Sequence, residues 1–258
     1  MKRFLFVACS IALLFPAIPA FSFDDNGGDK GKDPAVDDQS DPNNCPMSDS
    51  QLGAHLVAAP GNGGTVGGLF NGKRMWGAVV NRKGALCAFA TSQDDNSQVW
   101  PGSQAIAKAK AYTANGFSLD TSPLSTARLY TLTQPGHSLW SLGQSNPFDT
   151  QALAPPSGAS GGKGQVNGGL IFFGGGVPLY KNGLIVGGLG VSGDTSCADH
   201  EIAKRVRDLA GLNPTGGPLV DDITYSSKDG ASLYTHPLCF NTYRNGVSIG
   251  TEPVATGY

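Results

Sequence analysis

The stretch from Gly168 to Leu212 constrains the fold of this chain more than any other part. Lys181-Asn182-Gly183 separates two apolar runs, and Asn-Gly is the strongest short signal for a β-hairpin because both residues tolerate positive φ. The second run, residues 184–191, is uncharged and rich in glycine, which is typical of a central strand that another element approaches closely. The sequence therefore predicts strand, glycine turn, strand, tight turn, strand and then a helix.

The helix predicted after this hairpin has one apolar face. Its apolar side chains recur at i, i+1, i+4, i+7 and i+8, and they are Ile202, Ala203, Val206, Leu209 and Ala210. Ser196 and Asp199 have the spacing of a capping box, and Gly211 is suited to end the helix. Glu201 and Arg205 are four residues apart, so we expect them to pair on the solvent-facing side.

A second helix is predicted from residue 104 to residue 115, ending at Gly116. Lys110 and Thr113 lie on a mostly apolar face of this helix, where polar groups need partners. Two interpretations are open. Either Lys110 extends to solvent and Thr113 bonds back to its own helix, or both residues face a ligand pocket.

The remaining elements of the domain are shorter. Residues 74–80 and 85–91 predict two strands, joined by a turn in which Gly84 takes the left-handed conformation. Residues 47–59 predict a short helix. Residues 134–167 are irregular, and their apolar side chains either cover a pocket or plug the edge of the core; these are Trp140, Leu142 and Phe148.

The N-terminus has the pattern of a secretory signal. Two cations precede an apolar run and small residues, and cleavage is expected after Ala20 or Ser22. Loss of residues 1–22 changes the formal net charge from −2 to −4, which argues against nucleic acid and anionic membranes as partners. The apolar run is too short for a membrane span. Residues 23–44 predict a disordered acidic leader, and the expected location is periplasmic or secreted.

Four cysteines remain after the signal, and they are Cys45, Cys87, Cys197 and Cys239. An even number in an exported chain indicates two disulfides, for which three pairings exist. We favour Cys45–Cys87 and Cys197–Cys239; the second would bring His236 near His200. The alternative is a metal site that uses Cys197 and His200. The absence of C-x-x-C-H excludes a covalently attached c-type haem.

Three motifs in order resemble the GlcG/HbpS-type haem-binding family. Residues 106–117 are similar to its I-A-x-x-K-A-x-T-A-x-x-F helix. Residues 174–179, followed by residues 186–193, resemble its G-G-G-x-P and V-G-x-x-G-V-S-G signature. Residues 78–86 are similar to its A-V-V-D-x-x-G-x-L hairpin, with Asn81 in place of the aspartate.

The resemblance covers residues 74–212 and includes Asp199, where the family has an acidic residue opening the last helix. It implies an α+β fold with an antiparallel sheet of about five strands flanked by helices, broadly profilin-like, often assembled into homo-oligomers. It implies haem binding in some members and iron or cobalamin-linked roles in others. We expect a domain at residues 45–212 and a disulfide-tied extension at residues 213–258.

The first functional hypothesis is an exported protein that binds haem, a related tetrapyrrole or iron. Its pocket would lie between the helix face that carries Lys110 and Thr113 and the glycine-rich sheet, with Asp199 beside it. His200 and His236 are the expected axial and metal ligands, because neutral imidazole is the usual protein ligand to haem iron. Lys110 would pair with a haem propionate.

Two other classes of function are open. Asp199, His200 and Lys110 would supply acid–base chemistry in a cofactor-free enzyme acting on a small molecule, if they converge. No G-x-S-x-G and no metalloprotease helix is present. A non-catalytic accessory module is the third possibility, since fold does not fix function.

Overall fold

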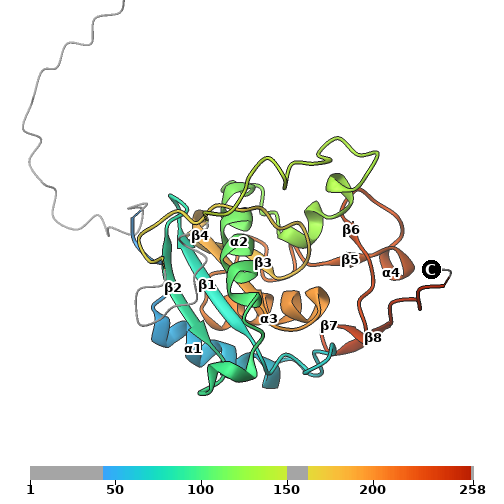
Figure 1. Cartoon of the computed structure of the whole chain (residues 1–258), viewed down its shortest axis with the longest axis horizontal. Helices are drawn as coiled ribbons and strands as arrows, with labels where there is room; N and C mark the ends of the chain where they lie inside the picture. Colours follow the sequence, from blue (N-terminus) through green and yellow to red (C-terminus); the bar gives the residue numbers. More distant parts are fainter. Residues whose placement is uncertain (1–42, 150–161, 257–258) are drawn as a thin grey trace, which may run out of the picture. The chain divides into compact units, whose positions relative to one another are not determined.

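The computed structural model describes residues 43–149 and 162–256 (Figure 1). The predicted signal peptide and residues 23–42 of the predicted leader lie outside the described residues. Within the described part, no helix is both long and apolar enough to cross a membrane.

The centre of the fold is an antiparallel sheet of four strands. These are β1 (Trp76–Asn81), β2 (Leu86–Thr91), β3 (Gly176–Lys181) and β4 (Leu184–Ser192), in the spatial order β2-β1-β4-β3. Each neighbouring pair is antiparallel. The α+β class with helices flanking an antiparallel sheet is therefore confirmed, with four strands in the described sheet where about five were expected.

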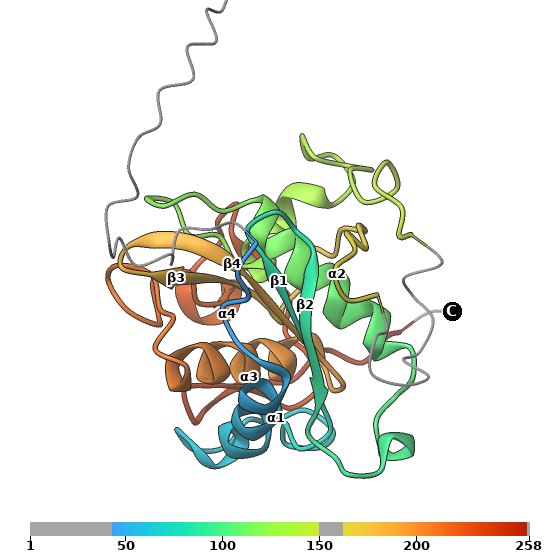
Figure 2. The ribbon, with the colours of Figure 1, turned by 90° about the vertical axis from the view of Figure 1, so that its left-hand side faces the viewer.

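Helices cover both faces of this sheet (Figure 2). α2 (Ser103–Gly116) packs on one face, where Ala78 and Val80 of β1 form a core cluster with its alanines. α1 (Asp49–Ala58) and α3 (Ser196–Leu209) pack on the other, with Val79 in the larger core cluster. The alternation of β1 side chains between two cores follows from the period of two in a strand.

The glycines of β4 let α2 approach the sheet backbone. A Cβ atom on Gly190 would lie 2.0 Å from the Ala107 carbonyl oxygen, and one on Gly188 would lie 2.3 Å from that of Ala111. Any larger residue would force the helix away. The close packing predicted for this strand is confirmed.

The local turns of the hairpins follow the sequence closely. Asn182 and Gly183 have φ values of 53° and 81°, as a type I′ turn requires, and Gly84 has φ 84°. The predicted capping box of α3 is wrong. Its N-cap is Thr195, whose hydroxyl accepts a hydrogen bond from the Ala198 amide, because the Asp199 carboxylate is directed into the core.

The C-terminal segment forms small elements that lie against α3. β5 (Thr224–Tyr225) pairs in parallel with β6 (Thr235–His236), and β7 (Thr242–Arg244) pairs antiparallel with β8 (Val247–Gly250). The remaining short helices are α4 (Ser226–Asp229), η2 (Ala59–Gly61), η3 (Asn96–Gln98), η4 (Thr126–Leu129) and η5 (Thr131–Thr133).

The expected pair of Glu201 and Arg205 forms, at 2.9 Å, but it does not face solvent. Both side chains are buried, at 2% exposure for Glu201 and 6% for Arg205. The Arg205 guanidinium donates to carbonyl oxygens of the glycine-rich loop that follows α1 and η2, including those of Gly63 and Gly64. The Asn245 amide donates to Glu201. The loop after η2 and the C-terminal segment therefore cover a polar face of α3 that its sequence predicts to be exposed to solvent.

The structure contains both disulfides that the cysteine pattern favoured. Cys45 is joined to Cys87 with a Cα–Cα distance of 5.5 Å, and Cys197 is joined to Cys239 with a Cα–Cα distance of 5.9 Å. The first connects the segment before α1 to β2. The second connects the first turn of α3 to the C-terminal segment.

Candidate functional site

The most unusual feature beside the sheet is a fully buried ion pair between Lys110 of α2 and Asp199 of α3. The Lys110 Nζ lies 2.7 Å from the Asp199 Oδ2 and also donates to the Val191 carbonyl oxygen at 3.0 Å. The other oxygen of Asp199 accepts the Asp194 amide at 2.9 Å. The side chains are 0% and 2% exposed, so the expectation that Lys110 extends to solvent is wrong.

Burial shifts both groups toward their neutral forms. It raises the pKa of Asp199 to about 6, against the opposing effect of the Lys110 charge. It lowers the pKa of Lys110, against the effect of Asp199. Burial without solvent disfavours the charged form of either group, and the partner offsets that cost in part.

Two threonine side chains, Thr113 of α2 and Thr126 of η4, form hydrogen bonds to the backbone of residues 170–176. The Thr113 hydroxyl donates to the Ala109 carbonyl, as expected, and accepts the Ile171 amide at 3.0 Å. The Thr126 hydroxyl donates to the Phe173 carbonyl at 2.7 Å and accepts the Gly176 amide. Residues 170–176 are therefore held by the Thr113 side chain of α2 and the Thr126 side chain of η4.

The position of Lys110 leaves no room for a side chain at residue 175, which is glycine. Gly175 has φ 117°, and a Cβ atom there would lie 2.6 Å from the Lys110 Nζ. The Lys110 ammonium also lies 5.1 Å from the centroid of the Phe173 ring, within the range of a cation–π contact.

The other side of this segment forms the wall of a cavity of about 260 Å³. Aromatic and aliphatic side chains dominate the lining, and the full set is Tyr130, Thr133, Gln134, Trp140, Ser141, Leu142, Gly143, Gln144, Leu170, Ile171, Phe172 and Phe173. Trp140 and Leu142 thus take the first of their two expected roles, covering a pocket. Phe148 packs instead against Gly169.

Lys110, Thr113 and Asp199 lie one layer behind this cavity. All three are buried; Thr113 bonds to Ile171, Lys110 lies beside Phe173, and Asp199 contacts Lys110. The sequence pointed to Lys110, Thr113 and Asp199, but sequence reasoning missed the cavity wall, and the role of these residues in binding stays a prediction. The signal that could have found it is the apolar run of Leu170 to Phe173, immediately before the glycine triplet.

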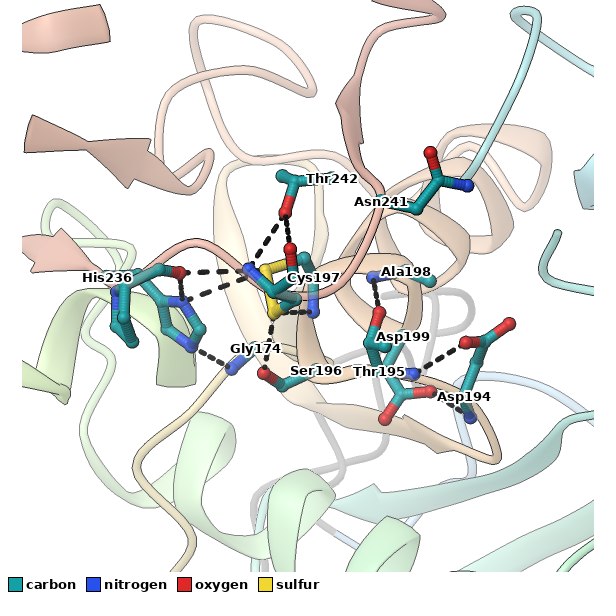
Figure 3. The surroundings of a disulfide bond; sticks show 12 residues. Gly174, Asp194, Thr195, Ser196, Cys197, Ala198, Asp199, His236, Asn241 and Thr242 are labelled. Atoms are coloured by element: carbon teal, nitrogen blue, oxygen red, sulfur yellow. Dashed lines mark hydrogen bonds between the residues drawn. A yellow bond between two sulfur atoms is a disulfide. The ribbon is translucent and has the colours of Figure 1, made fainter. Parts of the chain in front are cut away.

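His236 lies beside the Cys197–Cys239 disulfide and contacts Gly174, the residue that follows the cavity wall (Figure 3). Its Nε2 accepts the Gly174 amide at 3.2 Å, and its Nδ1 lies 2.7 Å from the Pro237 carbonyl oxygen. This pattern assigns the proton to Nδ1 and leaves no free lone pair. Burial lowers the pKa of His236 to about 4, so the imidazole is neutral near pH 7.

His200 is also buried and faces a carboxylate. Its Nε2 lies 3.4 Å from the Asp222 Oδ1, and Asp222 is also held by Lys204. Neither His200 nor His236 lines the aromatic cavity. Their assignment as haem ligands stays a prediction.

The alternative sites expected from the sequence are occupied by other interactions. Among the described residues, the one cluster of three metal-binding side chains is Cys197, Cys239 and His236, and its two sulfurs form the disulfide. A thiolate site of Cys197 with His200 is therefore not formed. Lys110 and Asp199 satisfy each other, while His200 faces Asp222, so the three groups of the proposed acid–base set do not meet in a shared pocket.

Comparison with known proteins gives a family for this geometry. Residues 69–208, slightly more than half of the chain, match the family described as haem-degrading HbpS-like proteins. The chain belongs to the HbpS-like family. The match spans the sheet, α2, the glycine triplet and most of α3, so this HbpS-like domain includes the buried pair and the cavity wall.

Solved structures with similar folds include Klebsiella pneumoniae protein ORFY, with 22% identity and a TM-score of 0.43 over 63% of this chain and 86% of that one. The PduOC:heme complex has 22% identity and a TM-score of 0.43 over 62% and 88% of the two chains. HbpS has 20% identity and a TM-score of 0.38 over 63% and 89%. No curated protein matches the HbpS-like chain.

Proposed function

We propose that this HbpS-like protein binds haem or a closely related tetrapyrrole, and that the aromatic cavity receives it. The observation that carries the proposal is the cavity wall itself. Phe172, Phe173 and Trp140 present flat apolar rings, which suit a flat apolar macrocycle. The description of the family as haem-degrading supports the same ligand class.

The mostly apolar and aromatic lining of the cavity fits a tetrapyrrole chemically. The volume of the cavity limits how much of the ligand it can enclose. Ligand pockets hold roughly 300–1,000 Å³, so about 260 Å³ accepts part of a tetrapyrrole and leaves the rest outside. The rim residues Trp140, Ser141 and Gln144 are exposed. A shallow site of this kind favours exchange of ligand over permanent retention.

Lys110, Thr113 and Asp199 act in this proposal through the wall. Thr113 bonds to Ile171, Lys110 lies beside the Phe173 ring, and Asp199 holds Lys110. The segment supported in this way presents Phe172 and Phe173 to the ligand. When bound, a haem would supply an iron centre for ligand binding or redox chemistry. The chain supplies the apolar surface and the rigid support.

The test is a haemin titration of the full-length protein, read in the Soret region. Trp140→Ala should weaken binding by about 2- to 10-fold, since an aromatic contact contributes roughly 0.5–1.5 kcal/mol. Trp100→Ala is the matched control, because Trp100 is 48% exposed against 52% for Trp140 and lines none of this cavity. No saturable band with the wild-type protein, or equal weakening by both variants, would refute the proposal.

Two further arms separate related possibilities. A His200→Ala/His236→Ala variant tests the ligands expected from the sequence; loss of the band in a folded variant would assign the iron to those imidazoles. Time-dependent loss of the Soret band in the presence of ascorbate would indicate degradation of haem beyond binding.

We also propose that the protein works outside the cytoplasm. Two disulfides suit an oxidising compartment, and residues 1–22 have the pattern of a signal peptide. N-terminal sequencing of the exported protein should begin at Phe21 or Phe23. Recovery of an intact Met1 terminus from that compartment would contradict this.

A further inference from the structure

The cavity that the proposed function assigns to a tetrapyrrole holds one side chain able to bind its iron. Proteins hold haem iron through His, Cys, Met or Tyr side chains. The cavity lining contains none of the first three types and a single tyrosine, Tyr130. The other oxygen-bearing side chains of the lining are neutral and do not ionise near pH 7; they are Thr133, Gln134, Ser141 and Gln144.

Tyr130 is held by the backbone on which it sits. It lies between η4 and η5, and its carbonyl oxygen accepts the Thr133 hydroxyl at 2.9 Å and the Gln134 side-chain amide at 3.1 Å. This short helical turn also carries Thr131, whose hydroxyl donates to the Thr235 carbonyl at 2.5 Å. Thr131, the residue that follows Tyr130, therefore connects this turn to β6.

The ring of Tyr130 is supported from behind by His236. The two ring centroids are 5.1 Å apart, at an interplanar angle of 53°. His236 is itself fixed by the Gly174 amide and the Pro237 carbonyl, and Pro237 lies two residues before the disulfide-bonded Cys239. The imidazole thus acts as a rigid backing for the phenol, which is half-buried and reaches the cavity.

Resting on the proposed function, we propose that Tyr130 ligates the iron through its phenolate oxygen, and that the site is selective for ferric tetrapyrroles. Ligation forms an iron–oxygen bond and breaks the phenol O–H bond, and the proton leaves to solvent through the open rim. A trivalent iron favours the anionic form of an oxygen ligand bound to it.

The proposal predicts a dependence on oxidation state. Reduction by dithionite adds one electron to the iron, and the lower charge weakens its bond to an anionic oxygen. The phenolate then recovers a proton from solvent as the bond breaks. The ferrous tetrapyrrole should therefore bind more weakly than the ferric one, and re-oxidation in air should restore the original spectrum.

The experiment compares haemin binding to wild-type, Tyr130→Phe and His137→Ala full-length proteins by Soret titration, resonance Raman and electron paramagnetic resonance. His137 is the control because it is an exposed imidazole in the same loop that does not line the cavity. Tyr130→Phe should remove the phenolate vibrations and weaken binding by at least the roughly 10- to 100-fold lost with outer-shell metal partners. His137→Ala should leave both unchanged.

Tyr130→His gives a second readout that a packing defect would not produce. It should bind haemin with an imidazole-type spectrum in place of the phenolate-type one. Phenolate vibrations absent from the wild-type complex, an unchanged spectrum in Tyr130→Phe, or loss of the band in His137→Ala would overturn the assignment while haem binding stands. Failure of the wild-type protein to bind haemin at all would instead refute the proposed function, and the assignment with it.

Discussion

Breaking the buried Lys110–Asp199 pair should destabilise the fold strongly. Lys110→Met removes the ammonium 2.7 Å from the Asp199 carboxylate and leaves that carboxylate 2% exposed without its counter-charge. Removal of one partner from a buried pair costs about 3–5 kcal/mol. For a domain of this size, 1 kcal/mol shifts Tm by roughly 2–4 °C, so the expected loss is about 6–20 °C.

A double-mutant cycle in guanidinium chloride measures this coupling. Asp199→Asn keeps an oxygen that can accept the Asp194 amide, and the Lys110→Met/Asp199→Asn variant removes both charges. The double variant should cost less than the sum of the single variants by at least about 1 kcal/mol, within the range for residues in contact. Lys73→Met, at an exposed position, is the matched control and should change stability by less than about 0.5 kcal/mol.

The cost of Lys110→Met should also depend on pH. Burial already raises the pKa of Asp199 to about 6, and without Lys110 only the hydrogen bond from the Asp194 amide opposes that effect. The folded variant therefore keeps the proton at pH values where the unfolded chain has released it. Its stability should fall by up to about 1.4 kcal/mol per unit as pH rises from about 4 through the folded pKa. A loss below about 1 kcal/mol at pH 7, or additive single variants, would refute the reasoning.

Two further perturbations test the packing and the tail. Gly190→Ala should destabilise the fold by at least about 1–3 kcal/mol, because its Cβ would lie 2.0 Å from the Ala107 carbonyl oxygen; Gly116→Ala, with nothing within 4 Å of its Cβ, is the control for the same urea measurement. Burial raises the pKa of Asp222, but the facing His200 imidazole, 3.4 Å away, and the charge of Lys204 outweigh it and hold that pKa below its usual range. The stability that Asp222 contributes is thus present above about pH 4 and lost as pH falls below that value. Asp222→Asn should therefore destabilise the protein more at pH 7 than at pH 2.5, where part of the contribution is already lost, and an equal effect at both would contradict the assignment.

The parts of the fold set by local chemistry could be predicted from the sequence. Asn182 and Gly183 specify their turn because few residues accept positive φ, and the period of α3 fixes its apolar face. The glycines of β4 indicated a close approach before its partner was known. Each of these features depends on residues within a few positions of one another.

Features that depend on distant segments could not be predicted. The sequence of α3 alone predicts that Glu201 and Arg205 face solvent. They are buried because the loop containing Gly63 and Gly64, together with Asn245, packs over them. The partner of Lys110 is 89 residues away, so its ion pair could not be derived from helix periodicity. The family motifs pointed to Lys110 and Thr113, which are buried, whereas the cavity is lined by residues 170–173 and by the irregular segment before them.

The two disulfides have a consequence for how the chain acquires its connectivity. Each joins cysteines that are neighbours among the four described ones, and each closes a loop with a sequence separation of 42. A chain that enters an oxidising compartment from its N-terminus presents Cys45 and Cys87 before Cys197 follows. Pairing in order of arrival therefore yields the native bonds out of three possible sets. If the protein is exported as proposed, its correct oxidation needs only pairing in order of arrival and no later exchange of partners.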